Sequence, residues 1–345
     1  PRPPGATGAW RQRFRTAFAG HRYPPGLIAV LVLSVAGSAL LGHQLGSPTA
    51  KPANTPAKQL TVSDPYVAGG TWFKGNLHVA SVRGLGKDLP SALGAWYTAH
   101  GYDFLGISDM NTYTWPEEYG NRALDGVPTV DTTYAFADVL GVGIDHWLPA
   151  PTLQGVIDWI AADGGLPVLA APLSPAKPQS LVTVMGLHGL YGLEVYDARL
   201  AQASAGEADA TELWDRLLSA GNRVFAFAGD DATGVSDPAI GGAWISVLAP
   251  TLDLNSLLSS LRRGAFVAST GAEFTSLSVA GATITAEATS GSNLRFIGSG
   301  GRLLKTVSAR AGSYRVVGNE GYVRVEAIRD DGTRAWSQPF FVSWR

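Results

Sequence analysis

Two short stretches decide the fold: Trp72-Phe-Lys-Gly-Asn-Leu-His78-Val-Ala80-Ser81 and Asp103-Phe-Leu-Gly-Ile-Ser-Asp109-Met110-Asn111-Thr112. Each has an apolar run typical of a buried strand and then polar side chains at the strand's end. From about residue 70 to residue 270, similar short apolar runs alternate with amphipathic stretches. This repeated β-then-α order predicts a parallel sheet or barrel in the α/β class.

The individual elements can be assigned from the same pattern. We expect strands at 72–78, 104–108, 139–143, 167–170, 192–196, 224–228 and 243–247. We expect helices at 89–100, 153–163, 208–220 and 254–263. From Glu273 onward the apolar residues recur at every second position, which is typical of strands with one buried face. Asp330-Asp-Gly-Thr333 predicts a hairpin turn, so residues 272–345 should form a sandwich-like all-β module.

The N-terminal region has a different composition. Residues 1–26 contain five Arg and no acidic residue, and 24–44 contain no charged residue. About 20 apolar residues can span a bilayer as a helix, and an Arg-rich flank favours the cytoplasmic side. We therefore expect a cytoplasmic tail at 1–24, a transmembrane helix at 25–44 and a Pro/Ala/Thr-rich linker at 45–66. Cleavage as a signal peptide near Ala36-Gly37-Ser38-Ala39 is the alternative.

Composition excludes several classes of function. The 319 residues after the tail hold 21 basic and 28 acidic side chains, which argues against a nucleic-acid partner. The chain has no Cys, so disulfides, thiolate metal sites and cysteine nucleophiles are excluded. The chain also has only six His, a small supply of imidazole ligands for a metal enzyme.

The strand-end motifs resemble those of the PHP (polymerase and histidinol phosphatase) superfamily of metal-dependent phosphoesterases. Its first motif reads like K-G-x-L-H-x-H-[ST] and its second like D-F-L-x-I-[ST]-D-H-N. The likeness continues at 168–172, 192–196, 227–233 and 261–271 and into the C-terminal module. The resemblance implies a distorted (β/α)7 barrel over residues 67–271, with metal ligands at the carboxyl ends of its strands.

This chain departs from the family at the metal ligands. Four motif histidines are replaced, by Ala80, Met110, Ala171 and Thr233. A family glutamate and a further histidine correspond only loosely to Asp131 and Asp138. Sites with two or three metals need imidazole as well as carboxylate ligands, and only His78 lies on a motif. The family's multinuclear site therefore cannot be assembled here.

Four motif residues remain that could hold a metal: His78, Asp109, Glu194 and Asp231. If they converge, three carboxylates share one pocket, and such ligands suit one Mg²⁺ or Ca²⁺. If the protein is active, Asp231 and His78 would be the catalytic residues. We expect instead that these are inherited polar residues at a solvated barrel mouth and that no cofactor binds, with the single cation as the alternative.

The sequence thus predicts a single-pass cell-membrane protein whose bulk is periplasmic or otherwise extracytoplasmic. We expect a catalytically inactive PHP-like protein that serves as a structural or accessory subunit, with integral membrane proteins as partners in a hetero-oligomeric complex. One alternative is an extracytoplasmic phosphoesterase with a reduced single-cation site. Another is a ligand- or glycan-binding module.

Overall fold

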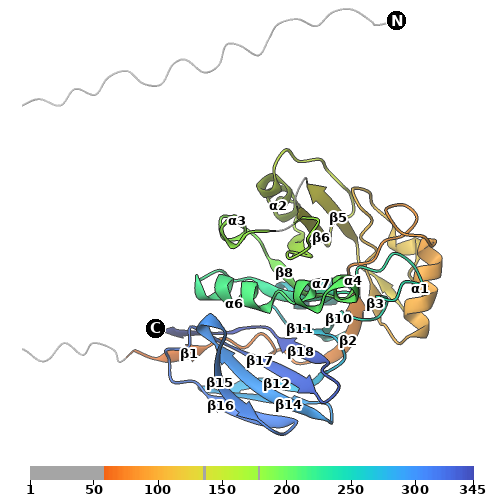
Figure 1. The fold of residues 1–345 in the computed structure, drawn as a ribbon. Coiled ribbons are helices and arrows are strands. Elements are labelled where there is room, and N and C mark those ends of the chain that lie inside the picture. The colour runs from red at the N-terminus through yellow and green to blue at the C-terminus, as the bar shows by residue number, and fades with distance from the viewer. Residues whose placement is uncertain (1–57, 135–136, 178) are drawn as a thin grey trace, which may run out of the picture. The chain divides into compact units, whose positions relative to one another are not determined.

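The computed structural model describes residues 58–134, 137–177 and 179–345 (Figure 1). The predicted tail 1–24, the predicted transmembrane helix 25–44 and most of the predicted linker 45–66 lie outside the described residues. Within the part of the chain that is described, no helix combines the length and apolar character needed to cross a bilayer. Residues 56–345 form one compact unit, to which all elements below belong.

Two sheets form the α/β part of this unit. The first runs in the order β11 (Phe266–Ser269), β10 (Trp244–Ala249), β2 (Thr71–Asn76), β3 (Phe104–Leu105) and β4 (Asp125–Gly126). The second runs in the order β5 (Thr129–Tyr134), β6 (Ala137–Val142), β7 (Leu166–Ala170), β8 (Gly192–Asp197) and β9 (Phe225–Gly229). Strands β2-β3-β4 and β7-β8-β9 are parallel, whereas β6 and β10 are antiparallel to their neighbours.

The predicted α/β class is therefore observed, but the strands are not arranged as one closed parallel barrel. In the described residues β9 lies against β10 and β11 without joining their sheet. Strand β6 is antiparallel to both β5 and β7, and no helix lies between β5 and β6, whereas a helix at Leu153–Ala162 lies between β6 and β7. The parallel strands of both sheets nevertheless end at the same cavity, which is the property that positions the site.

Seven α-helices and two short 3-10 segments lie among the described residues. They are α1 (Pro90–Ala99), α2 (Leu153–Ala162), α3 (Leu181–Met185), α4 (Ala198–Ala203), α5 (Ala205–Ala208), α6 (Thr211–Ser219), α7 (Leu254–Arg262), η1 (Pro116–Glu118) and η2 (Ser299–Gly301). Helices α1, α2, α6 and α7 match the four predicted helices. The sequence did not predict α3, α4 and α5, because helices of four to six residues leave no periodic pattern to detect.

The C-terminal part is rich in strands, as expected. One sheet has the order β12 (Phe274–Ala280), β13 (Thr283–Ala288) and β16 (Ala311–Arg315). The facing strands are β1 (Leu60–Val62), β14 (Ser292–Gly298), β15 (Arg302–Val307), β17 (Tyr322–Arg329), β18 (Arg334–Ser337) and β19 (Phe340–Trp344). Phe274, Ile284, Phe296 and Val325, which come from both layers, are buried in one apolar cluster. The predicted hairpin is confirmed, since β17 and β18 pair across residues 330–333.

The end of the predicted linker belongs to the folded body instead. Leu60–Val62 forms β1, which pairs antiparallel with β19. Tyr66 is buried, and its hydroxyl donates to the Phe266 carbonyl and accepts from the Gln338 amide. The assignment of 45–66 as a spacer was therefore wrong at its C-terminal end. Because the predicted linker is mostly polar, the short alternation of Leu60 and Val62 was not recognised as a strand. Both side chains pack on the apolar cluster of the C-terminal part.

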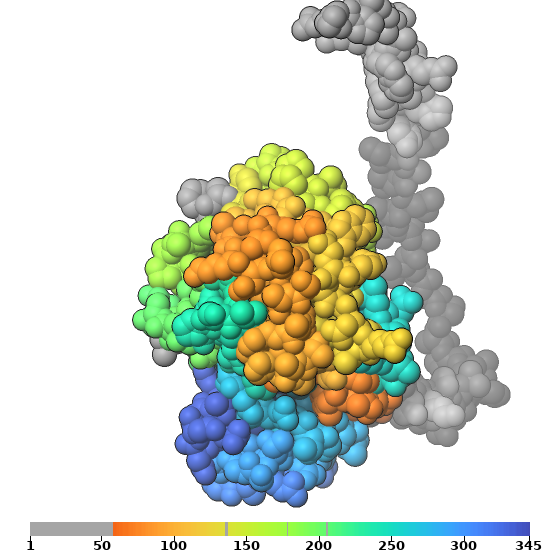
Figure 2. All heavy atoms as spheres, turned by 90° about the vertical axis from the view of Figure 1, so that its right-hand side faces the viewer, coloured from red at the N-terminus to blue at the C-terminus, as the bar shows by residue number. Residues whose placement is uncertain are grey.

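A single sheet joins the two parts of the molecule. Strand β11 pairs with β18, so the sheet continues across the boundary that we expected at residue 271. The buried Arg324 of β17 also binds Asp215 of α6 through two hydrogen bonds, of 2.8 and 2.7 Å. Figure 2 shows the C-terminal strands, in blue, gathered at one end beneath the α/β part.

Candidate functional site

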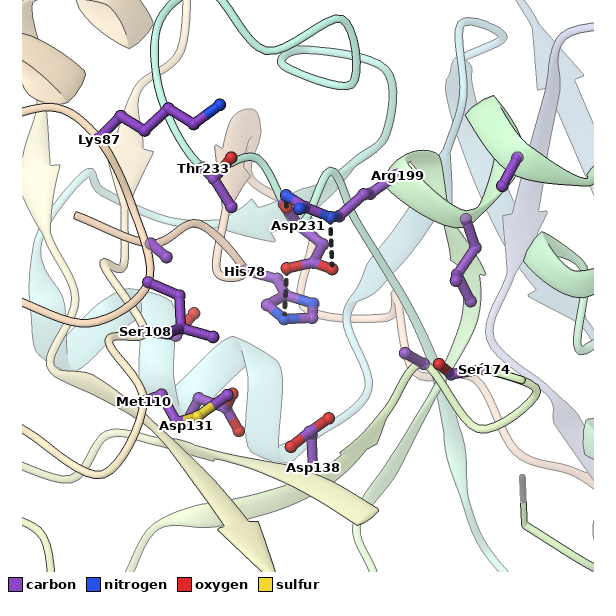
Figure 3. A pocket seen from close by; sticks show the side chains of 15 residues that line it. His78, Lys87, Ser108, Met110, Asp131, Asp138, Ser174, Arg199, Asp231 and Thr233 are labelled. Carbon is purple, nitrogen blue, oxygen red and sulfur yellow. Dashed lines mark hydrogen bonds and ion pairs between the residues drawn. The ribbon is translucent and has the colours of Figure 1, made fainter. Parts of the chain in front are cut away.

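The site is a cavity of about 440 Å³ at the ends of the parallel strands (Figure 3). Its lining includes the replaced motif positions and the two acids that matched the family only loosely. The residues concerned are His78, Ala80, Met110, Asp131, Asp138, Ala171, Asp231 and Thr233. These positions span more than 150 residues of sequence. The sequence analysis left open whether these positions converge, because no single segment of the chain could show it.

His78 lies at the centre of the site and is 6% exposed. Its Nδ1 is 3.0 Å from Glu194 Oε1, and its Nε2 is 3.4 Å from Asp231 Oδ1. Burial alone lowers the pKa of His78, but the charges of Glu194 and Asp231 outweigh burial, and the pKa is raised well above its usual value. The raised pKa favours the protonated imidazole, whose two ring nitrogens are both directed at carboxylates.

The structure brings together three of the four predicted metal-site residues and places the fourth apart. Asp109 is completely buried and accepts hydrogen bonds from the Ser81 amide at 2.6 Å and from the hydroxyls of Ser81 and Thr114 at 2.5 Å. This carboxylate therefore ties the segment after β3 to the segment after β2. It has no contact with His78 among the described residues.

Three more acids lie at the site: Asp197, which the sequence analysis did not select, and Asp131 and Asp138, which it matched to family ligands only loosely. Asp197 lies three residues after Glu194, and a register shift in β8 between Glu194 and Tyr196 brings both acids to His78. Asp131 and Asp138 come from β5 and β6. In a regular strand, Glu194 and Asp197 would point to opposite faces because they are three residues apart. The pair therefore depends on the bulge, which the sequence pattern does not show.

Two of the buried acids carry an oxygen without a hydrogen-bond partner in the described structure, Asp131 Oδ1 and Asp197 Oδ2. Burial and then the nearby Asp138 raise the pKa of Asp131 well above its usual value. Burial and then Glu194 and Asp231 raise the pKa of Asp197 to about 8. Both carboxyls therefore hold their protons to a higher pH than an exposed Asp does, which removes part of the repulsion among the acids.

Basic side chains of the protein neutralise the remaining charge. Lys177 Nζ binds both oxygens of Asp138, at 2.7 and 3.0 Å. Arg199 Nε lies 3.9 Å from Asp231 Oδ2, and Arg199 Nη1 donates to the Asp231 carbonyl at 3.2 Å. Figure 3 shows the Arg199 guanidinium above Asp231, with His78 on the other side of that carboxylate.

Backbone strain is concentrated here. In the described structure three residues other than Gly adopt positive φ: Asn111 (54°), Ala171 (39°) and Asp231 (50°). Each follows a strand that ends at the cavity, and two of them line it. The Ala171 amide donates to Glu194 Oε2 at 2.9 Å, so this backbone conformation fixes the partner of His78. Such strain is typical of functional sites.

Asp230, next to Asp231, supports the site from beneath. It is completely buried and accepts hydrogen bonds from the Tyr97 hydroxyl, Asn76 Nδ2 and the Gly241 amide. Burial raises its pKa to about 7, and these hydrogen bonds oppose the shift. Asp230 therefore anchors the strained turn and is not directed into the cavity.

Comparison with solved structures finds likenesses at low sequence identity. A two-domain protein from Bacteroides vulgatus that contains a predicted PHP-like metal-dependent phosphoesterase matches at 12% identity and a TM-score of 0.48, over 83% of this chain and 98% of its own. A candidate metal-dependent phosphoesterase from Bifidobacterium adolescentis matches at 14% identity and a TM-score of 0.38, over 55% of this chain and 96% of its own. An amidohydrolase from Chromobacterium violaceum matches at 13% identity and a TM-score of 0.36, over 47% and 88%. No family model and no curated protein matches the sequence.

Proposed function

We propose that this protein is a catalytically inactive PHP-like protein, anchored in the membrane, that serves as an accessory subunit of a membrane protein complex on its extracytoplasmic side. One observation carries the inactive part of the proposal. At this cavity protein cations stand beside the acids: His78 between Glu194 and Asp231, Lys177 on Asp138, and Arg199 on Asp231.

The donor set does not fit a multinuclear metal site. Two-metal hydrolysis needs ligands that hold the ions about 3.5–4 Å apart and generate hydroxide. Ala80, Met110 and Ala171 line the cavity, and none of these side chains can take the place of an imidazole as a metal ligand. His78 is occupied by carboxylates at both nitrogens. The site thus has acidic side chains such as a metal centre uses, but cationic side chains of the protein balance their negative charge.

The membrane and subunit parts of the proposal come from the sequence. The uncharged stretch 24–44 follows five Arg and precedes a Pro-, Ala- and Thr-rich segment, which is the order expected of an anchor and a tether. A folded body on a short tether has a high effective concentration toward partners in the same membrane. A folded domain that has no catalytic activity can still bind such a partner through its surface.

Metal content and hydrolysis test the inactive part. For the full chain in mild detergent, we expect less than one equivalent of bound transition metal and no hydrolysis of bis(p-nitrophenyl) phosphate with Mg²⁺, Mn²⁺ or Zn²⁺. Restoring imidazole with Ala80→His, Met110→His, Ala171→His and Thr233→His should raise bound Zn²⁺, whereas Gln at the same four positions should not. Two bound metals in the wild type, or turnover that Asp231→Asn abolishes, contradicts the proposal.

Isolation from native membranes tests the subunit part. We expect a stoichiometric integral membrane partner to co-purify with the full chain in mild detergent. A chain that emerges alone and monomeric, with its fold intact by circular dichroism, contradicts the subunit assignment. This result would leave the conclusion on metal content unaffected.

A single hard cation is the second candidate, favoured by the two unpartnered oxygens. His78, Glu194 and Asp197 each offer a ligand atom within 4.8 Å of the others, and Asp197 Oδ2 is one of the unpartnered oxygens. Mg²⁺ or Ca²⁺ bound by these acids would polarise a phosphoryl oxygen. Binding would also displace the proton from Asp197. Calorimetric titration in buffers of different ionisation enthalpy should then show proton release, which Asp197→Asn removes. Heat that is identical for wild type and variant contradicts this site.

A further inference from the structure

The two parts of the folded body carry opposite charge. Residues 67–271 hold 10 basic and 21 acidic side chains, whereas 272–345 hold 9 basic and 6 acidic ones. Ala288 to Asn319 contains five basic residues and no acid. The C-terminal part is therefore a local basic surface on an acidic protein, and the site described above has no share in it.

The exposed basic side chains of this part lie beside exposed apolar ones. We define the basic edge as Arg302, Lys305, Arg315, Val317, Trp344 and Arg345. Val317 is 65% exposed and Trp344 is 51% exposed, and Leu303, next to Arg302, is 55% exposed. Exposed apolar side chains that are gathered in one patch and rimmed by polar ones mark surfaces that bind proteins or membranes.

Contacts among three elements bring these residues together. Lys305 Nζ of β15 donates to the Ser313 carbonyl of β16 at 2.7 Å. The Trp344 indole at the end of β19 donates to the Gly318 carbonyl in the turn after β16 at 2.9 Å. Burial and Glu320 raise the pKa of Tyr314, and the nearby Arg302 opposes this shift. The basic edge is thus one surface, built from β15, β16 and β19.

The acid closest to this surface does not cancel its charge. Glu320 is completely buried and accepts hydrogen bonds from the Tyr314 hydroxyl and from the amides of Val317 and Gly318, each at 2.8 Å. Its carboxylate shapes the turn that presents Val317. The outward charge of the basic edge therefore comes from Arg and Lys alone.

The described chain begins beside this surface. Gln59 exchanges two backbone hydrogen bonds with Arg345, of 2.7 and 2.9 Å, and β1 lies beside the C-terminal strand (Figure 1). Fourteen residues separate Gln44 from Gln59, a reach of at most about 50 Å. If 25–44 spans the membrane, as the proposed function holds, the basic edge stays within that distance of the lipid headgroups.

We propose that the basic edge docks on the headgroups of an anionic bilayer. Trp prefers the interface between lipid and water, and Arg and Lys gain from anionic headgroups, by about fivefold in partitioning for each charge. Apolar side chains that are separated from one another by basic ones suit a lipid surface. The core of a protein interface is instead depleted in Lys and continuous in apolar area. The inference rests on the anchor in the proposed function and adds a second membrane contact.

Hydrogen exchange of the full chain in lipid nanodiscs tests the docking. In discs that contain phosphatidylglycerol, backbone amides of 302–318 and 340–345 should exchange at least about fivefold more slowly than in discs of phosphatidylcholine alone. Raising NaCl to about 1 M, where the Debye length is about 3 Å, should remove the difference.

Charge reversal provides the matched variants. Arg302→Glu, Lys305→Glu and Arg315→Glu together should abolish the protection. Arg122→Glu, Arg216→Glu and Arg263→Glu make the same change in net charge at exposed positions of the α/β part and should leave it intact. Unchanged exchange in peptides of the α/β part shows that both triple variants are folded.

Several results would overturn the inference. Equal exchange in both lipids, or protection that survives reversal of the basic edge, excludes electrostatic docking. Protection that arises only after an integral membrane protein is added identifies the edge as a protein interface instead. A chain that the discs do not retain contradicts the anchor, and with it both proposals, whereas a retained chain with an unprotected edge overturns the docking alone.

Discussion

At the scale of single residues, the decisive feature is that one imidazole lies among several carboxylates and pairs with two of them. His78 has Glu194 at one ring nitrogen and Asp231 at the other, and both His78 and Glu194 are buried. A buried charge is tolerated only when it is paired, and the two carboxylates raise the pKa of His78 and so favour its charged form. Removing one member leaves the other charge buried without its partner, so the loss in the free energy of unfolding exceeds the net contribution of the intact pair.

Glu194→Gln should therefore destabilise the protein more than a surface charge change does. The variant leaves His78 with one carboxylate and lowers its pKa in the folded state. We expect a loss of about 3 kcal/mol in the free energy of unfolding at pH 6, measured by chemical denaturation. Glu212→Gln, which breaks an exposed pair with Arg216, is the control and should cost less than about 1 kcal/mol. Equal effects of the two variants would contradict the buried pair.

The site acids should make the protein less stable as the pH rises. The folded-state pKa of Asp197 is about 8, against 3.8 as its usual value, so the folded state retains a proton that the unfolded state loses. Its contribution is fully present below pH 3.8 and is lost as the pH rises to about 8. Asp197→Asn should flatten this decline by at least about 1 kcal/mol and keep the side-chain acceptor for the Leu200 amide. Identical slopes of unfolding free energy against pH in wild type and variant would contradict the shift.

Strain at Ala171 gives a prediction with the opposite sign. Its φ of 39° is costly for a residue with a Cβ, and Gly adopts it freely. Ala171→Gly should raise the free energy of unfolding by about 1 kcal/mol. Ala170→Gly, one residue earlier in the regular strand β7, should lower it by a similar amount or more. If both variants destabilise the protein equally in thermal unfolding, the strained conformation is not present in solution.

At the scale of elements, α6 and β17 are joined by a buried ion pair. Asp215 accepts from Arg324 Nε and Nη2 and from the Tyr322 hydroxyl, at 2.8, 2.7 and 2.7 Å. The Arg324 side chain is 3% exposed and also binds Glu326 at 2.7 Å. This cluster links a helix of the α/β part to the central strand of the C-terminal part.

Breaking this link should be costly. Asp215→Asn leaves Arg324 buried with a single carboxylate, and we expect a loss of about 3–5 kcal/mol in the free energy of unfolding. The double variant with Arg324→Met should recover part of this loss, because it removes the unpaired charge. A cycle of urea denaturation measurements on the four proteins checks the coupling. Strictly additive effects would show that the pair is not formed.

At the scale of the whole molecule, the α/β part and the β-rich part share one sheet. Strand β11 pairs with β18, and Gln338 exchanges two hydrogen bonds of 2.8 Å with the Ala226 backbone. Because these contacts cross the boundary expected at residue 271, the parts should unfold together. Tryptophan fluorescence and far-ultraviolet circular dichroism should give coincident denaturation curves. Two separated transitions would show that the parts are independent domains.

Much of the fold could be predicted because it depends on local pattern. The apolar runs at 167–170 and 192–196 coincide with β7 and β8, and the stretch 254–263 with α7, since periodicity and caps such as Asp253 are properties of neighbouring residues. The predicted strand at 139–143 overlaps β6, but its antiparallel partner β5 was missed. This polar Thr-rich strand, with Asp131 facing the cavity, does not read as a buried run.

The sequence by itself determined that imidazole is scarce, since the six His among 345 residues can be counted without coordinates. Only the tertiary structure decided what the surviving acids do. In the folded protein the Asp109 carboxylate accepts hydrogen bonds from Ser81 and Thr114, and a bulge in β8 places Asp197 close to His78. Folding also placed Lys177 and Arg199 beside acids from other strands. The physical reason is that a residue's identity is local, whereas charge balance depends on distances between segments that only folding brings together.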